Sequence, residues 1–287
     1  MQPISMLSGV SALVRTWNSE RTLKLTLRAL RKQRPALHEI IVVDSGSTDS
    51  TLEIARSFDC RIIRYPAGRE FNYSVALNLG IEAVQGEYCL ILSSHNVLLF
   101  EDVVEIMLRT LERAAVAAVY CKTALKGGDF LHRAAPLRGR LVDIVYKDTF
   151  DGTNGLWNAC SLGRTSVFRE SPFCESTPTA EDQIWAAGQY ERFSRPTARI
   201  RMAGVLSLNP YHTAKKDAFE TAVVASRLFP DRLATRMLAK RCASALIEFL
   251  AGNAKGGLCE LEMFREMVRF RFRRSKVSSR YHLGKRG

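Results

Sequence analysis

No stretch of the 287-residue sequence approaches the roughly 18 uninterrupted apolar residues that a membrane-spanning helix needs. The first residues also lack the basic segment and the following apolar segment that are typical of a signal peptide. The seven cysteines are scattered, odd in number and without a C-x-x-C pair, which argues against a zinc motif and a disulfide framework. These absences predict a cytoplasmic protein in a reducing compartment.

Acidic residues are in deficit, and the deficit is uneven along the chain. There are 42 Lys and Arg against 29 Asp and Glu, a formal net charge of +13. Eight basic residues and no acidic residue lie between Arg269 and Gly287, which leaves +5 for the 268 residues before them. With 46% apolar and 25% charged residues, the chain has the composition of an ordinary globular protein, which excludes a disordered or fibrous one.

The first 120 residues alternate short apolar runs with helical patterns. Leu23, Leu27 and Leu30 recur at helical spacing, and we expect Asn18 or Ser19 to cap that helix. Strands are expected at residues 9–16, 39–44, 61–65, 88–92 and 116–120, with further helices at about 48–58, 73–84 and after 101. Strands separated by helical crossovers predict βαβ units and an α/β fold with a mostly parallel central sheet flanked by helices.

The second half of the sequence is less regular. Residues 122–155 show no clear periodicity, which favours a loop or short strands that cross the site. Beyond Pro230 the pattern is helical again, and a second helix is expected over about 258–272. We therefore expect an α/β domain over residues 1–230 and a helical extension with a basic tail over 231–287.

Three groups of polar residues are expected just after strands, where the ligands of open α/β sheets bind. Residues 44–49 (DSGSTD) end the second strand; Asp44 could accept from a base or a ribose hydroxyl, or the segment could simply be a helix-capping turn. His95 and Asn96 follow the strand at 88–92 and could contact a metal or a diphosphate, or His95 could be an ordinary loop histidine.

Two adjacent acids, Glu181 and Asp182, form a third polar group and open an amphipathic stretch. Acidic side chains suit a helix N-terminus electrostatically, which is one interpretation of this pair. Alternatively, one of the two carboxylates serves as a general base.

Four segments in this order, VRTWNSERTL, VVDSGSTDST, ALNLGIEAVQGEY and AEDQIW, resemble the family 2 glycosyltransferases of the GT-A fold. The resemblance covers roughly residues 10–212. It implies an α/β domain that binds a nucleotide-diphospho-sugar and a base that deprotonates an acceptor hydroxyl for an inverting displacement. It also implies a glycan or lipid-linked acceptor, in the assembly of cell-surface polysaccharide, lipopolysaccharide or glycolipid.

The resemblance assigns roles position by position. It implies donor-nucleotide contacts at Thr16, Asn18, Asp44, Asn78 and Ser93. It implies that Asp182 is the catalytic base, with Glu181 as the alternative. Contacts with the diphosphate or a metal are implied for His95, Asn96 and His212.

The sequence departs from the family pattern at the metal motif. The family's D-x-D is replaced by Ser93-Ser94-His95, which resembles a subgroup with S-x-H, although Val75 stands where that subgroup's arginine is expected. A histidine-bearing site favours Mn²⁺ over Mg²⁺, so a divalent cation is an open expectation here. Uracil recognition is not assumed either, because Ser45 replaces the second of two adjacent acids.

Two other classes of function compete with catalysis. The missing D-x-D would suit a transferase-like protein that binds a nucleotide or a partner without turnover, but the intact E-D-x-x-W segment favours catalysis. Basic and aromatic residues interleave at Arg269–Arg274, yet no nucleic-acid-binding signature accompanies them, so we expect no nucleic acid partner. The tail from Arg269 to Arg286 suits peripheral attachment to an anionic membrane, or is a solvated helix end.

Overall fold

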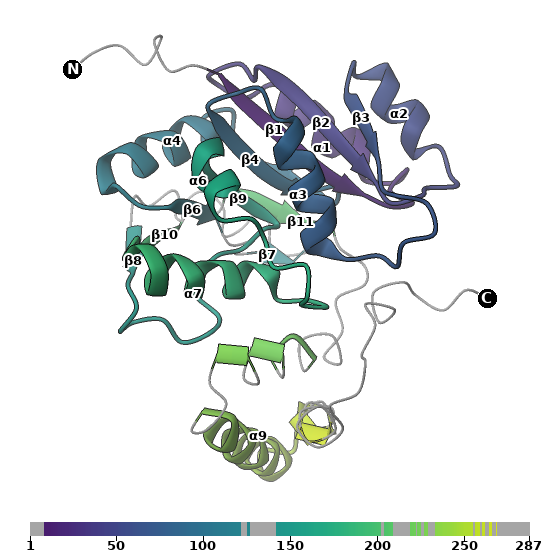
Figure 1. The fold of residues 1–287 in the computed structure, drawn as a ribbon. Coiled ribbons are helices and arrows are strands. Elements are labelled where there is room, and N and C mark those ends of the chain that lie inside the picture. Colours follow the sequence, from purple (N-terminus) through teal and green to yellow (C-terminus); the bar gives the residue numbers. More distant parts are fainter. Residues whose placement is uncertain are drawn as a thin grey trace.

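The computed structural model describes residues 9–121, 125–126, 142–201, 204–208, 219–221, 223–224, 227–228, 233–254, 256–258, 260–261, 264–265 and 268. Its centre is a twisted sheet with helices on both faces (Figure 1). The predicted α/β class is confirmed.

The central sheet has eight strands in the order β3-β2-β1-β4-β9-β6-β10-β8. Their bounds are β1 Val10–Thr16, β2 Glu39–Asp44, β3 Arg61–Arg64, β4 Tyr88–Ser93, β6 Ala118–Cys121, β8 Val142–Val145, β9 Cys160–Arg164 and β10 Thr197–Ile200. Six strands run in one direction, while β9 lies antiparallel between β4 and β6 and β8 lies antiparallel at the edge. The sheet is therefore mixed but mostly parallel, as predicted.

A second sheet of three short strands has the order β5-β11-β7. The strands are β5 Asn96–Leu98, β7 Leu125–Lys126 and β11 Val205–Ser207. Because β5 begins only three residues after β4 ends, this sheet continues from the carboxyl edge of the central one.

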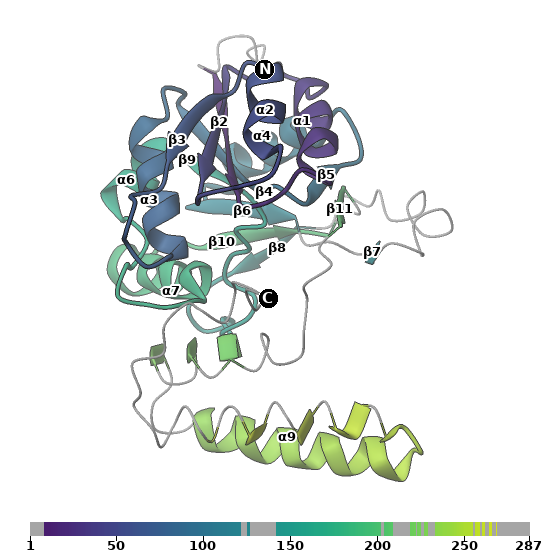
Figure 2. The same cartoon turned by 90° about the vertical axis from the view of Figure 1, so that its right-hand side faces the viewer.

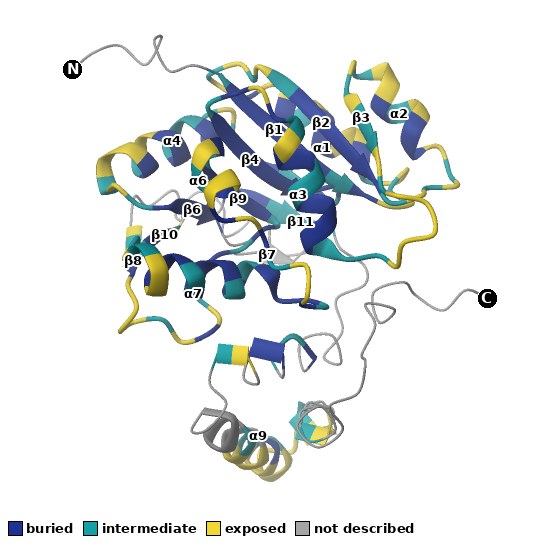
Figure 3. Cartoon of the chain, in the orientation of Figure 1, coloured by how far each residue is buried: buried dark blue, intermediate teal, exposed yellow. Residues whose placement is uncertain are grey.

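Helices cover both faces of the central sheet because β1, β2, β4 and β6 bury apolar side chains on both sides. Apolar residues of α1 Leu23–Arg31, α2 Thr51–Ser57 and α4 Val103–Ala114 share one core with the sheet. Those of α3 Tyr73–Ala83, α6 Thr165–Glu170 and α7 Glu181–Phe193 share the other. Figure 3 shows the buried strands between these layers.

The helix α9 Leu233–Leu250 lies outside the two layers in both views (Figures 1 and 2), and the described residues from 254 to 268 are helical. The division into residues 1–230 and 231–287 stays a prediction. Within the described part of the chain, no helix is both long and apolar enough to span a bilayer.

The expected cap of α1 is wrong. The N-cap is Thr22, without a side-chain hydrogen bond, because Ser19 contributes its backbone carbonyl to the N–H groups of Thr22 and Leu23. The side chains of Asn18 and Ser19 instead bond to neighbouring loops. Of the irregular segment 122–155, the described residues include the short strands β7 and β8.

Candidate active site

The carboxyl ends of β1, β2 and β4 bring three predicted site residues to one edge of the sheet. Thr16 is the register partner of Asp44, and Arg15 is the partner of Ser93. The chain runs outward from β1 through β2 to β3 and then returns to β4 on the other side of β1. This reversal of strand order marks the edge where ligands of open α/β sheets bind.

Asp44 organises the turn that follows β2. Its carboxylate is fully buried and accepts hydrogen bonds from the backbone N–H groups of Gly46 (3.1 Å) and Ser47 (3.2 Å). Arg64 of β3 lies 3.2 Å away and neutralises the charge. Gly46 has a φ of +91°, which a side chain would strain. The Asp44 carboxylate thus stabilises the turn through hydrogen bonds and forms an ion pair with Arg64.

Asn18 ties the loop after β1 to this turn. Its side-chain oxygen accepts from the N–H of Thr48 at 2.8 Å, and its own N–H donates to the Ser47 hydroxyl at 2.9 Å. These bonds accompany a left-handed backbone at Asn18, with a φ of 44°. A 2.8 Å bond between the Ser19 and Ser94 hydroxyls extends the connection to the loop after β4.

The segment after β4 carries the predicted diphosphate or metal residues. Asn96 is fully buried; its amide nitrogen donates to the carbonyl of Ala159 at 2.7 Å, and its side-chain oxygen has no hydrogen-bond partner. His95 is half-buried, and its carbonyl accepts from the N–H of Leu208 at 2.8 Å. Within the ranges that the structure describes, no three His, Cys, Asp or Glu side chains form a group that could hold a metal.

The acidic pair opens α7, which begins at Glu181 as expected. Asp182 accepts hydrogen bonds from the N–H of Gln183 (2.8 Å) and of Asn158 (3.4 Å). Burial and the neighbouring carboxylates of Glu181 and Glu220 raise the pKa of Asp182 from its usual 3.8 to about 7. A carboxylate with such a pKa exchanges a proton near neutral pH, as a general base must.

A short segment before β9 connects the acidic pair to Asn96. Asn158 donates to Asp182, and the carbonyl of the next residue, Ala159, accepts from the Asn96 amide. Because β9 is antiparallel to β4, the start of β9 lies at the end of β4, with Cys160 as the register partner of Leu92. The reversed strand thereby brings the acidic pair into the same region as the loop after β4.

Sequence reasoning missed Arg15, which lies in the penultimate position of β1. Its guanidinium is 3.4 Å from the Glu181 carboxylate and lies over the Tyr73 ring at 5.1 Å. The side chains of Arg15 and Glu181 are only 12% and 9% exposed. The available signal was a single cation in an otherwise apolar strand, which has to find a partner where it is buried.

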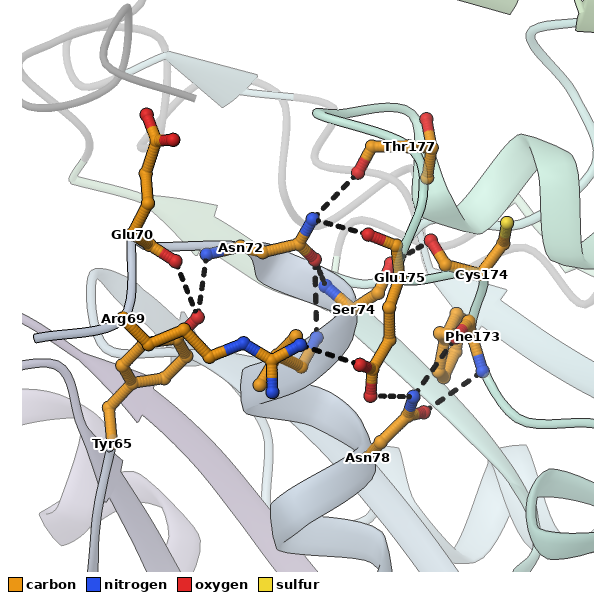
Figure 4. A network of polar contacts seen from close by, with 11 residues as sticks. Tyr65, Arg69, Glu70, Asn72, Ser74, Asn78, Phe173, Cys174, Glu175 and Thr177 are labelled. Carbon is orange, nitrogen blue, oxygen red and sulfur yellow. Dashed lines mark hydrogen bonds and ion pairs between the residues drawn. The ribbon is translucent and has the colours of Figure 1, made fainter. Parts of the chain in front are cut away.

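The side chain of Asn78 is engaged in contacts within the protein, and its predicted contact with the donor stays a prediction. The Asn78 amide donates to the Phe173 carbonyl (2.9 Å) and to the Glu175 carboxylate (3.1 Å), and its oxygen accepts from the Phe173 N–H (2.9 Å). Figure 4 shows these contacts between α3 and the segment after α6. In this arrangement Asn78 fastens a loop, because its donors and acceptor are already engaged.

Asn72 makes a similar connection at the start of α3. Its oxygen caps the helix by accepting from the N–H groups of Ser74 and Val75, while its nitrogen donates to the carbonyls of Glu175 and Thr177 (Figure 4). Three residues beyond Thr177 lies Ala180, whose φ of 58° is left-handed and strained for a residue with a side chain. The two asparagines therefore hold the segment that delivers the acidic pair.

His212 lies outside the described residues, and so does the basic tail from Arg269 to Arg286. The predicted contact of His212 with a diphosphate or metal stays a prediction.

A parallel sheet that reverses its strand order beside β1, with polar loops at that edge, is the arrangement of nucleotide-binding α/β proteins. The family model described as glycosyl transferase family 2 matches residues 11–172, more than half of the sequence, and the chain belongs to this family. The matched range ends before α7, so it includes Thr16, Asp44 and Ser93 but not the acidic pair.

Comparison with individual proteins is consistent with this membership. Over 91 residues the chain is 32% identical to chondroitin synthase from Escherichia coli. The aligned residues cover 30% of this chain and 13% of that enzyme. The chain thus spans only a small part of this relative's length.

Solved GT-A structures share the fold. The mannosyltransferase PcManGT from Pyrobaculum calidifontis, in complex with GDP-Man and Mn²⁺, matches with a TM-score of 0.66 at 16% identity over 93% of this chain and 88% of that chain. S. aureus TarS in complex with UDP-GlcNAc matches with a TM-score of 0.57 at 18% identity over 76% of this chain and 66% of that chain.

Proposed function

We propose that this chain is an inverting glycosyltransferase that moves a sugar from a nucleotide-diphospho-sugar to an acceptor hydroxyl. The observation that carries the proposal is Asp182, a carboxylate at the start of α7 with a pKa of about 7. The acceptor oxygen forms a bond to the anomeric carbon while the bond from that carbon to the diphosphate breaks. The acceptor proton passes to Asp182, and the nucleoside diphosphate leaves with the bonding electron pair.

Polar atoms without partners support a ligand at this edge. Among the described residues, four buried atoms here lack a hydrogen-bond partner: Thr16 Oγ1, Arg15 Nε, Asn96 Oδ1 and Asn158 Nδ2. Buried polar groups are costly to leave unpaired, so a cluster of them in one region suits the binding of a polar molecule. Sugar hydroxyls and phosphate oxygens have the required donors and acceptors.

We place the nucleoside over the ends of β1 and β2, at Thr16, Asn18 and Asp44, and the diphosphate near Ser93 and His95. Asp44 and Asn18 are engaged in shaping the turns, so they act mainly by presenting backbone groups of this edge to the donor. Asn78 acts through the loop that it fastens. Proteins of this fold have been solved with UDP-GlcNAc and with GDP-Man, so the fold accepts uracil or guanine. For this chain we propose the class of donor, a nucleotide-diphospho-sugar.

PcManGT was solved with Mn²⁺, which raises the question of a metal here. The described residues offer one imidazole at His95 and one unpaired amide oxygen at Asn96, which is too few ligands for a metal site made by the protein alone. The mechanism above therefore uses no metal. If the diphosphate itself carries a cation, we expect Mn²⁺ in preference to Mg²⁺, because His95 supplies a nitrogen ligand.

The proposed acceptor is a glycan or a lipid-linked sugar, with the protein attached to an anionic membrane through its basic end. Large apolar side chains are exposed near the end of α9, where Ile247 is 64% and Leu250 80% exposed. Basic and apolar groups together suit an anionic membrane surface. Liposome sedimentation of the full chain and of a chain truncated before Arg269 tests this; loss of binding to anionic but not neutral vesicles is the expected result.

The experiment for the reaction combines a donor screen with a transfer assay. Nucleotide sugars are screened by thermal shift with Mn²⁺, Mg²⁺ or a chelator, and the donor that stabilises the protein is then offered with acceptors. The Asp182→Asn variant should bind that donor as the wild type does and fail to transfer. A variant that turned over at the wild-type rate would refute the assignment of the base.

A further inference from the structure

Arg15 occupies a position in β1 that the strand's alternation assigns to the core. Side chains two apart on a strand face the same way, so Arg15 shares a face with Leu13, which belongs to the core that the sheet shares with α3 and α7. The arginine reaches the same two helices at their first residues, Tyr73 of α3 and Glu181 of α7. A cation held between two helix N-termini, which carry partial positive charge, requires a compensating anion.

Glu181 is that anion. Its carboxylate is 9% exposed, lies 3.4 Å from the guanidinium, and takes part in the one ion pair that the described residues give to Arg15. The Tyr73 ring completes the enclosure, with the guanidinium 5.1 Å from the ring centre.

The neighbouring carboxylate has a different environment. Asp182 receives hydrogen bonds from the backbone N–H groups of Gln183 and Asn158 and has no ion pair among the described contacts. The other titratable groups facing it are Glu220, which accepts from the Thr179 hydroxyl at 3.2 Å, and the Tyr120 hydroxyl of β6. Among the described contacts, Glu181 is thus paired with a cation, whereas Asp182 accepts only backbone hydrogen bonds.

We propose that Arg15 is a positioning residue that keeps Glu181 as a carboxylate, and thereby makes Asp182 the member of the pair that takes up a proton. The inference deepens the proposed function and rests on it for its meaning in catalysis. The charge of Glu181 then acts on Asp182 by repulsion, since a second negative charge beside an ionised carboxylate is unfavourable. The pair resembles other sites in which neighbouring carboxylates have different tasks because their surroundings differ.

Removal of the arginine has a definite consequence. With Arg15→Met, the buried Glu181 has no cation, and a buried carboxyl group without a cation favours its neutral form. The negative charge beside Asp182 disappears, so the pKa of Asp182 falls. Glu181→Gln removes the same charge directly and should have the same effect on Asp182.

The test measures the titration of Asp182 in two independent ways. The first is ¹³C NMR of aspartate-labelled protein, with the Asp182→Asn variant used to assign the signal. The second is the acid limb of the pH–rate profile of sugar transfer. We compare the wild type with Arg15→Met, Glu181→Gln, the double variant and the charge-conserving Arg15→Lys, and urea unfolding checks that each variant is folded.

We expect Arg15→Met and Glu181→Gln each to lower the pKa of Asp182 by about one unit, with no further decrease in the double variant, because both remove one charge. Arg15→Lys should retain the wild-type titration. Glu220→Gln is the matched control: it should also lower the pKa, but additively with Arg15→Met, since Glu220 acts separately.

The inference is overturned if the NMR titration of Asp182 is the same in Arg15→Met and the wild type, or if the shifts of Arg15→Met and Glu181→Gln add in the double variant. An NMR shift without a matching shift of the pH–rate profile has a different meaning. It would support the role of Arg15 and refute Asp182 as the base, which separates this inference from the proposed function.

Discussion

Replacing the proposed base should stabilise the protein while it abolishes transfer, and the stabilisation should depend on pH. In Asp182→Asn the amide has nearly the same shape as the carboxyl group, and its oxygen can still accept from the Gln183 N–H. The substitution removes a negative charge from a site where burial and two neighbouring carboxylates oppose it. The change in stability therefore reports the cost of ionising Asp182 in the folded protein.

The sign follows from the raised pKa. Below about pH 4 the carboxyl group is protonated in both folded and unfolded chains, so the two proteins should differ little. Between pH 4 and 7 the carboxyl ionises in the unfolded chain but stays protonated in the folded one, and the wild type loses stability relative to the variant. A pKa raised from 3.8 to about 7 corresponds to about 2–4 kcal/mol once coupling to Glu181 is allowed for.

The assay is urea unfolding of both proteins at a series of pH values from 4 to 8. The difference in free energy of unfolding should grow with pH and level off above pH 7. Asp59→Asn is the control, because Asp59 is exposed and asparagine tolerates its left-handed backbone, with a φ of 51°. The reasoning would be refuted if the difference in free energy of unfolding were equal at pH 4 and pH 8, or if the wild type were the more stable protein at pH 8.

Three further predictions concern other parts of the site. Asn78→Ala leaves two buried backbone groups of Phe173 unpaired and should lower the free energy of unfolding by about 2–4 kcal/mol. Glu82→Ala, an exposed substitution on the same helix, should change that free energy little. Weaker donor binding at unchanged stability would instead support a direct contact of Asn78 with the diphosphate. His95→Ala should weaken the thermal stabilisation that Mn²⁺ gives in the presence of donor, and an unchanged Mn²⁺ titration would place any metal elsewhere. Ala180→Gly should raise the stability by about 0.5–1 kcal/mol in urea unfolding, because glycine adopts a φ of 58° without strain; a loss of stability would contradict this.

Much of the sheet could be predicted because its strands are apolar runs of four to seven residues between helical patterns. β2 was predicted with its observed bounds, Glu39–Asp44, since four β-branched residues in six leave little alternative. β9 and β10 were not predicted. β9 contains a glycine and ends in an arginine, and its reversed direction depends on contacts with β4 and β6 that are distant in sequence.

The site could be predicted in part for the same reason. Thr16, Asp44 and Ser93 meet because parallel strands in register end at one edge, which a strand assignment already implies. The donor contact of Asn78 was implied by the family resemblance and stays a prediction, whereas the contact of its side chain with Phe173, 95 residues further along the chain, could not be read from the sequence. Arg15 was overlooked because its partner, Glu181, is 166 residues away.

Among the described strands, the antiparallel β9 alone joins the two halves of the central sheet, since β4 and β6 pair with it and not with each other. Until β9 is in place, the strands that carry Thr16 and Asp44 belong to one half and β6, β10 and β8 to the other. The segment before β9 also supplies the N–H group of Asn158, which donates to Asp182, and the carbonyl of Ala159, which accepts from Asn96. Completion of the sheet and assembly of the proposed site therefore depend on the same strand, and a chain without β9 in place would lack the contacts that join Asp182 and Asn96 to the sheet.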